Sequence, residues 1–351
     1  MPLFYLLLIL IISIIILCFL RIYFRGAQCK IKHSMKGKVV IITGASAGIG
    51  KESALDLVKH GAQVILGCRN ELKTKKAMES LTEEEKKLIK FIKLDLCDFD
   101  CIIKFAEEVK KEYKKVDILM NNAGLFTQSY SLTKDGLETY LQGNFTGHFL
   151  LTFLLFDILD KNEARIINLS SLAHTGTDYI NDINIQEMYD NSKSRIKYFS
   201  SLKGKSTLYS NTKILMLYFS KFLAQLCEEK YSYIKSASVH PGAVETEFGR
   251  FIFEDGYKFI KYILILFIPL IKLISKTSVD GAQTQLHLCY LPFKEFVSGA
   301  YYSDCNVTKT KDFANDFNKI KLCMELTVQE IKKKIPSINA FDILNDILGK
   351  K

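Results

Sequence analysis

Short β-branched segments alternate with helical segments through most of this chain, and that alternation restricts its fold more than any other feature. Strands are predicted over residues 38–43, 63–68, 91–94, 116–120, 165–169 and 234–239. Helices are predicted between them, over residues 51–60, 71–90, 99–113, 137–159 and 209–228. Strands joined through helices pair in parallel, with helices covering both faces of the sheet. The sequence therefore predicts a single α/β domain with a doubly wound parallel sheet over residues 38–305.

The turn after the first strand is rich in glycine. Residues 43–50 read TGASAGIG and lead directly into the first helix of the domain. Glycine lets the backbone turn tightly and approach a pyrophosphate, and the N-terminus of a helix stabilises its negative charge. In this strand–turn–helix context the loop predicts a Rossmann-like dinucleotide site. The expected cofactor contacts in the loop are Gly44, Ser46, Gly48, Ile49 and Gly50.

The end of the second strand indicates which dinucleotide is bound. Sites for NAD usually place an acidic residue there, because a carboxylate binds the ribose hydroxyls and repels a 2′-phosphate. This strand ends in Gly67-Cys68-Arg69-Asn70, and the first acidic residue is Glu71. The guanidinium of Arg69 can pair with a phosphate through two hydrogen bonds. The sequence therefore predicts NADP(H), with a solvated charge at a strand end as the alternative interpretation of Arg69.

The chain begins with an apolar segment. Residues 3–20 contain only Ser13 as a polar interruption, and they would span about 27 Å as a helix, close to the thickness of a hydrocarbon core. A cleaved signal peptide is the alternative, but it would need a basic start and a small-residue cleavage site. Residues 21–50 carry six basic and no acidic side chains, which places the main domain in the cytosol. We expect a transmembrane anchor at 1–24 and a basic linker at 25–37.

The charge of the remaining chain argues against a nucleic-acid partner. The net charge is +10, but residues 51–305 carry 33 basic and 32 acidic side chains. A nucleic-acid-binding domain needs a basic face. The nine cysteines include no CxxC pair, which favours free thiols in a reducing compartment and no metal site.

Three segments depart from the alternation of strands and helices. Residues 175–206 are polar and irregular, and we interpret them as an insertion. Residues 251–276 contain an apolar stretch, 259–274, that two lysines and a proline interrupt. We interpret it as a substrate lid or membrane-contact segment, because lysine can extend its charge into water beside an apolar face, with an ordinary buried helix as the alternative. Residues 306–351 are predicted to be a Lys-rich tail with one or two weak helices.

Several short motifs occur together over residues 36–305. They are the TGASAGIG loop, Asp95, Asn121-Asn122-Ala123-Gly124, Asn144, Ser171, Tyr209-Ser210-Asn211-Thr212-Lys213 and His240-Pro241-Gly242. Each motif is weak alone, but together and in this order they closely resemble the short-chain dehydrogenase/reductase family. Residues 67–69, 143–152, 165–174, 238–242 and 298–302 resemble its retinol dehydrogenase branch.

The resemblance implies a membrane-anchored enzyme that interconverts retinal and retinol, or other lipophilic alcohols and carbonyl compounds, usually with NADPH. It further implies a lipophilic small molecule as substrate and the endoplasmic reticulum as the membrane, and it is compatible with a homodimer. Ser171 and Tyr209 are 38 residues apart, which is longer than usual for the branch, so the substrate stays open. The alternatives are a hydroxysteroid or 3-ketoacyl-lipid reductase and, more remotely, a non-catalytic NADP-binding membrane protein.

The resemblance also assigns roles to individual residues. Tyr209 would exchange a proton with the substrate oxygen, and Lys213, on the same helix face, would favour the phenolate and hold the nicotinamide ribose. Ser171, rather than Ser170, would donate a hydrogen bond to the carbonyl, and Asn144 would hold a proton-relaying water. The remaining expected cofactor contacts are Asp95 and Leu96 at adenine, Asn122, Ala123 and Gly124 at nicotinamide, and Pro241, Gly242, Val244 and Thr246 beyond the sixth strand.

Two further groups of polar residues lie in or near these motifs. His148 and His174 are tempting general bases, but they lie outside the catalytic set that the resemblance implies, and we expect both to be structural. Glycosylation sequons occur at Asn144, Asn168 and Asn306. The sequon is common by chance and carries little information alone.

Overall fold

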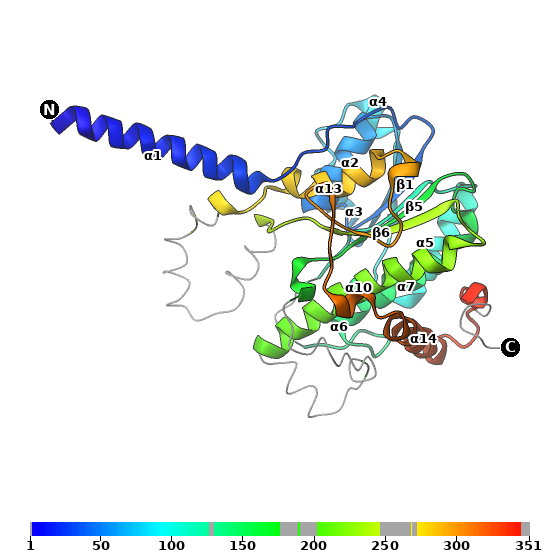
Figure 1. Ribbon diagram of the computed structural model, residues 1–351. Coiled ribbons are helices and arrows are strands. Elements are labelled where there is room, and N and C mark those ends of the chain that lie inside the picture. The colour runs from blue at the N-terminus through cyan, green and yellow to red at the C-terminus, as the bar shows by residue number, and fades with distance from the viewer. Residues whose placement is uncertain are drawn as a thin grey trace.

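The computed structural model describes residues 2–125, 130–175, 189, 202–245, 268 and 272–344, and one eight-stranded sheet lies at its centre (Figure 1). The strands, in spatial order, are β3 (Ile89–Lys93), β2 (Gln63–Cys68), β1 (Val39–Thr43), β4 (Ile118–Asn121), β5 (Ala164–Leu169), β6 (Ile234–His240), β7 (Tyr301–Ser303) and β8 (Asn306–Thr308). Neighbouring strands from β3 to β7 are parallel, and β7 pairs with β8 antiparallel. The predicted doubly wound parallel sheet is confirmed.

Helices cover both faces of the sheet because successive strand residues point to opposite faces and most of them are apolar. Ile41 and Leu119 belong to the core on one face, and Val40 and Met120 to the core on the other. The first face is covered by α5 (Phe99–Glu112), α7 (Gly147–Leu154), α10 (Leu202–Glu228) and α14 (Phe317–Lys334), and the second by α2 (Gly48–Lys59) and α13 (Ser278–Tyr290).

The strand order reverses beside β1. The chain runs outward from β1 to β2 and β3, and then returns to place β4 on the other side of β1. The loops that follow β1 and β4 therefore diverge at the carboxyl edge of the sheet, where ligands bind in open α/β folds. This reversal fixes the place of the site described below.

The prediction of one continuous helix over residues 71–90 is wrong. The structure has two short helices, α3 (Glu71–Ala77) and α4 (Glu83–Lys86), and then β3, which begins at Ile89. Thr82 accepts a hydrogen bond from the Glu85 backbone N–H, and the Glu85 carboxylate accepts one from the Thr82 N–H. This capping box starts a new helix and interrupts the charged pattern that suggested a continuous one.

The helix predicted over residues 137–159 is also interrupted. It consists of α6 (Thr139–Leu141), a π-turn (Gln142–Thr146), α7 and a 3-10 turn (Phe156–Ile158). A β-carbon on Gly147 would lie 2.5 Å from the carbonyl oxygen of Leu96, and one on Gly143 would lie 2.5 Å from the Leu125 side chain. The two glycines therefore let this segment approach the loops after β3 and β4.

The C-terminal segment packs against the body of the domain more closely than its composition suggested. Its α14 buries Ile320, Met324 and Ile331 in the same core as α7 and α10, and Phe341 joins them. The strands β7 and β8 were absent from the sequence prediction because each has only three residues. Helix α10 begins at Leu202, seven residues before the predicted start.

Helix α1 (Pro2–Arg25) projects away from the domain (Figure 1). Among the described residues it is the one helix long and apolar enough to cross a membrane, and none of its span Leu7–Arg25 is buried. Its end is fixed to the domain, because Arg25 Nε donates to Asp280 Oδ1 at 2.7 Å and Arg21 lies 3.6 Å from the same carboxylate. Within the linker, Lys32 pairs with Asp56 of α2. The basic linker is therefore ion-paired to the domain.

Most of the predicted insertion, 175–206, lies outside the described residues. Its one described residue between 176 and 201 is Tyr189, which is partly buried. The Tyr189 hydroxyl lies 3.2 Å from the Thr146 hydroxyl and 3.3 Å from the Thr327 hydroxyl. Most of 251–276, including nearly all of the apolar stretch 259–274, also lies outside the described residues.

Candidate active site

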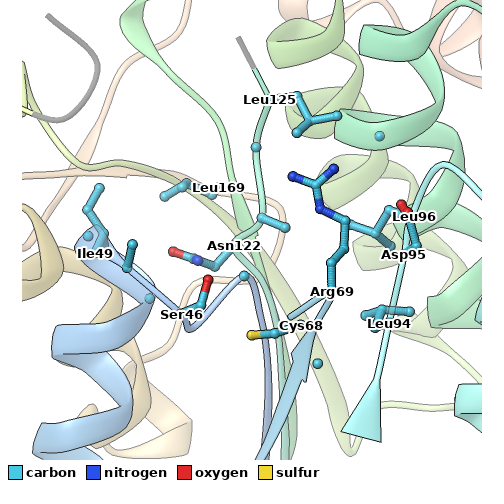
Figure 2. Close-up of a pocket in the computed structure, with 18 of the residues that line it drawn as sticks. Ser46, Ile49, Cys68, Arg69, Leu94, Asp95, Leu96, Asn122, Leu125 and Leu169 are labelled. Carbon is cyan, nitrogen blue, oxygen red and sulfur yellow. The ribbon is translucent and has the colours of Figure 1, made fainter. Parts of the chain in front are cut away.

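A cavity of about 560 Å³ opens at the carboxyl edge of the sheet, between the loops that follow β1, β2, β3 and β4 (Figure 2). Thirteen predicted cofactor contacts line it, namely Gly44, Ser46, Gly48, Ile49, Gly50, Arg69, Asp95, Leu96, Asn122, Ala123, Gly124, Tyr209 and Lys213. Residues far apart in the sequence thus converge on one site.

The hydroxyl of Thr43 joins two walls of this cavity. Its oxygen accepts hydrogen bonds from the backbone N–H groups of Asn122 and Ala123, each at 2.9 Å. The Asn122 side chain returns a hydrogen bond to the Thr43 carbonyl oxygen at 2.8 Å. Thr43 is completely buried, so water does not compete for these bonds. The Gly-rich loop and the Asn-Asn-Ala-Gly loop are therefore held in a fixed relation before any ligand binds.

Two glycines are required in the Gly-rich loop by close contacts. Gly44 has a φ of +73°, and a β-carbon there would lie 2.9 Å from Ala123. A β-carbon on Gly50 would lie 2.4 Å from the amide nitrogen of Asn122. The N-cap residue of α2, Ala47, has no side chain that caps the helix. The first N–H groups of α2 are therefore available to a bound pyrophosphate.

Arg69 lies at the end of β2 and reaches across the cavity toward Leu96 and Leu125 (Figure 2). Within the described part of the chain no carboxylate lies within ion-pair distance of it, whereas Lys75 on the adjacent α3 is paired with Glu71 at 2.7 Å. Lys73 also lines the cavity. This end of the site therefore offers positive charge without a neutralising acid.

Tyr209 and Lys213 lie on successive turns of α10 and line the same cavity. The Lys213 Nζ lies 5.6 Å from the centre of the Tyr209 ring, and it donates to the carbonyl oxygen of Leu169 at 3.0 Å. A β-carbon on Gly124 would lie 3.6 Å from the same Nζ. The ammonium group therefore lies between the predicted catalytic tyrosine and the predicted nicotinamide loop.

Asn144 lies in the π-turn beside these groups but does not itself line the cavity. Its Oδ1 accepts from the Leu125 N–H at 2.6 Å, and its Nδ2 donates to the Leu125 carbonyl at 3.1 Å and to the Thr212 hydroxyl at 3.2 Å. The side chain therefore connects the loop after β4 to the helix that carries Tyr209. Its predicted role in holding a water stays a prediction.

The two serines at the end of β5 have different surroundings. Ser170 Oγ donates to the Lys213 carbonyl oxygen at 2.6 Å and is buried. Ser171 Oγ instead accepts from the Ala173 N–H at 3.2 Å and donates to no acceptor among the described residues. The geometry therefore favours Ser171 over Ser170 as a donor to substrate, although Ser171 lies outside the cavity lining.

The two histidines differ in how their ring nitrogens are used. His148 is fully buried, its Nδ1 donates to the Asn144 carbonyl at 3.1 Å, and its Nε2 lies 2.9 Å from the Thr43 hydroxyl. Burial lowers the pKa of His148 to about 3, so the ring is neutral at physiological pH. His174 Nδ1 donates to the Ser171 carbonyl at 2.6 Å. Both arrangements agree with the structural roles expected for these rings.

Of the four predicted contacts beyond β6, the three described ones, Pro241, Gly242 and Val244, are not part of the cavity lining. Pro241 and Gly242 follow β6 directly, and Val244 pairs with Lys276 in a parallel bridge. Thr246 lies outside the described residues. Within the described residues, no three His, Cys, Asp or Glu side chains gather as a metal site.

The sequence analysis missed several residues that line the cavity. They are Ala47, Gly67, Cys68, Asn70, Lys73, Leu94, Cys97, Leu125, Gly143 and Leu169. Most of them immediately precede or follow a predicted contact at the end of a strand. Their positions beside Arg69, Asp95 and Gly124 were therefore the signal that could have identified them.

Comparison with known proteins identifies the class to which this fold and site belong. A family model described as short chain dehydrogenase matches residues 38–200. Retinol dehydrogenase 12 of Mus musculus is 37% identical over 289 residues, which cover 82% of this chain and 84% of that protein. Retinol dehydrogenase 11 of Homo sapiens is 35% identical over 284 residues, which cover 80% and 81%. The chain belongs to the short-chain dehydrogenase family.

Solved structures share the fold. A protein from Mycobacterium Paratuberculosis is 24% identical with a TM-score of 0.65, and the match covers 88% of this chain and 98% of that one. A short chain dehydrogenase from Shigella flexneri, solved as a complex with NADP, has a TM-score of 0.53 and 19% identity, and the match covers 77% and 98%. With its family shown, this chain is an oxidoreductase of the alcohol dehydrogenase type that uses a nicotinamide cofactor.

Proposed function

We propose that this protein uses NADP(H) to interconvert a lipophilic alcohol and its carbonyl compound, with retinol and retinal as the leading pair. The observation that carries the proposal is that the uncapped N-terminus of α2, Arg69, Tyr209 and Lys213 all border one cavity. A dinucleotide bound there would place its pyrophosphate at the α2 N-terminus and its nicotinamide beside Tyr209 and Lys213.

The bound nicotinamide would supply or accept the hydride, and the protein's own residues would manage the proton. In the reducing direction, Ser171 donates a hydrogen bond to the carbonyl oxygen and stabilises its developing charge. Tyr209 then gives its proton to that oxygen, and the nearby Lys213 ammonium stabilises the phenolate that remains. In the alcohol product, the hydride has become a hydrogen on carbon and the proton from Tyr209 has become the hydroxyl hydrogen.

The substrate class rests on the relatives and on the anchor. The relatives at about 35% identity are named retinol dehydrogenases, and α1 would keep the site close to a membrane in which lipophilic substrates concentrate. A hydroxysteroid or a 3-ketoacyl lipid remains the alternative substrate, because the same catalytic residues serve each of these carbonyl groups. A non-catalytic NADP-binding protein is disfavoured because Tyr209, Lys213 and Ser171 are all present.

A substrate panel tests this proposal. Full-length protein in detergent micelles should reduce all-trans-retinal or a medium-chain aldehyde with NADPH, and more slowly with NADH. Tyr209→Phe is the matched control, because it removes one hydroxyl and should abolish most turnover. If no retinoid, steroid, ketoacyl lipid or aldehyde is converted in either direction, the proposed reaction is wrong.

The choice of NADP(H) gives a sharper expectation at Arg69. Arg69→Asp replaces a cation with a carboxylate that repels a 2′-phosphate, and a charged hydrogen bond is worth roughly 1.5–3 kcal/mol. NADPH affinity, measured by fluorescence titration, should fall on the order of tenfold or more, with NADH affected less. Lys76→Asp makes the same charge change on α3, outside the cavity lining, and should leave both affinities nearly unchanged. An unaltered preference in Arg69→Asp would show that Arg69 is only a solvated charge.

We further propose that the anchor places residues 25–351 on the cytosolic side of a membrane, expected to be that of the endoplasmic reticulum, with residues 259–274 as a further membrane contact. The sequons support this side. Asn144 and Asn168 are buried, and a glycan added before folding would prevent their burial, whereas Asn306 is exposed and would report translocation directly.

Protease digestion of sealed microsomes tests the topology. Added protease should degrade the catalytic domain, and endoglycosidase should leave the mass of the protein unchanged. A matched Asn306→Gln variant should then migrate like the wild type. A protected domain, or a glycan lost in Asn306→Gln, would place the domain in the lumen instead.

A further inference from the structure

The turn that carries Ser171 is held by two histidines that have no assigned part in the reaction. Near the carboxyl end of β5, Ser170 N donates to Val239 O of β6 at 2.8 Å. Ser171 then leaves the sheet and enters a 3-10 turn, Leu172–Thr175. Beyond the ladder, the direction of the Ser171 side chain depends on the hydrogen bonds of this turn.

His240, the last residue of β6, extends the ladder with its side chain. The Leu172 N–H donates to His240 Nδ1 at 3.2 Å. A backbone N–H can only donate, so Nδ1 is the acceptor and the ring proton lies on Nε2. The peptide bond that joins Ser171 to Leu172 is therefore attached directly to the end of a central strand.

His174 holds the other side of the same peptide unit. Its Nδ1 and its backbone N–H both donate to the Ser171 carbonyl oxygen, at 2.6 and 3.1 Å. The Ala173 N–H donates to Ser171 Oγ at 3.2 Å. The carbonyl, the following N–H and the hydroxyl oxygen of Ser171 are thus all held by hydrogen bonds, and within the described part of the chain the hydroxyl proton has no acceptor.

We propose that His240 is a positioning residue for the reaction, and that it acts by accepting the Leu172 N–H and so aiming the Ser171 hydroxyl at the substrate carbonyl. This inference rests on the proposed function, because it assumes that Ser171 donates to the carbonyl. His240 itself does not move a proton in the reaction, and it is needed as a neutral acceptor.

The surroundings keep the His240 ring neutral. The charged or titratable groups that face it are Lys276, Asp304, His174 and Lys213. Burial and, after it, the Lys276 ammonium lower the pKa of His240 to about 4. The acceptor at Nδ1 is therefore present throughout pH 6–8, and the effect of His240 should not depend on pH in that range.

Two amide substitutions at His240 test whether the position of the acceptor atom matters or only the presence of a polar side chain. In His240→Asn the amide oxygen lies as many bonds from the backbone as Nδ1, and in His240→Gln it lies one bond further. In single-turnover reduction with NADPH, the His240→Asn protein should retain at least about half of the wild-type rate. The rate of the His240→Gln protein should fall on the order of tenfold. NADPH affinity should stay within about twofold of the wild type in both variants.

A double-mutant cycle asks whether His240 acts through Ser171. In a Ser171→Ala background, where the hydroxyl is absent, His240→Gln should reduce the residual rate by less than about twofold. His33→Gln, an exposed ring whose Nδ1 lies 3.0 Å from Ile31 O, is the control and should match the wild type.

Three results would overturn the inference. They are equal rates in His240→Asn and His240→Gln, an equal loss of rate from His240→Gln in the wild-type and Ser171→Ala backgrounds, or an NADPH affinity that falls as far as the rate. A wild-type protein without turnover would refute the proposed function separately. In that case ¹⁵N nuclear magnetic resonance of the histidines decides, because a protonated Nδ1 on His240 at pH 7 would exclude the hydrogen bond on which the inference depends.

Discussion

The buried hydroxyl of Thr43 joins the loop after β1 to the loop after β4, and the site depends on this connection. One oxygen accepts two backbone N–H groups, from Asn122 and Ala123, at 2.9 Å each. The Asn122 N–H also donates to the Met120 carbonyl oxygen at 3.0 Å, so the Ala123 N–H depends most on this hydroxyl. Because both loops lie where the strand order reverses, this contact sets the width of the dinucleotide cavity.

Further hydrogen bonds connect the Thr43 hydroxyl to α10, the helix that carries Tyr209 and Lys213. Thr43 meets His148 Nε2, and His148 Nδ1 donates to the carbonyl of Asn144 in the π-turn. The Asn144 side chain reaches Thr212 on α10, one residue before Lys213. The π-turn thus places a carbonyl and an amide where a regular helix would present different groups, which agrees with the frequent occurrence of such turns at functional sites.

The parts of this arrangement that depend on local sequence could be predicted. The β-α alternation gave the sheet, and strand ends marked by Gly44, Arg69, Asp95 and Asn122 gave most of the cavity lining. The π-turn could not be predicted, because Gly143 within it and Gly147 directly after it are required by contacts with Leu125 and Leu96, which are distant in sequence. The packing of α14 and the ion pair between Arg25 and Asp280 could not be predicted either, because both join segments that only the fold brings together.

The anchor and the active site also meet through tertiary contacts. Lys276 pairs with Asp304, and a β-carbon on Gly26 would lie 2.3 Å from Asp304 Oδ1, while one on Gly242 would lie 2.6 Å from Lys276. Gly26 follows α1, and Gly242 follows β6 beside His240. One ion pair therefore lies between the end of α1 and the turn that follows β6.

The measurement that tests this account most directly is NADPH binding to full-length Thr43→Val. Valine keeps the volume of threonine and removes the oxygen that holds both N–H groups. We expect the dissociation constant to rise on the order of tenfold or more, because the hydrogen bonds that join the two loops through this oxygen are lost. Thr43→Ser keeps the oxygen and should bind within about twofold of the wild type. A Thr43→Val protein that is folded and binds NADPH as tightly as the wild type would contradict the view that this hydroxyl preorganises the site.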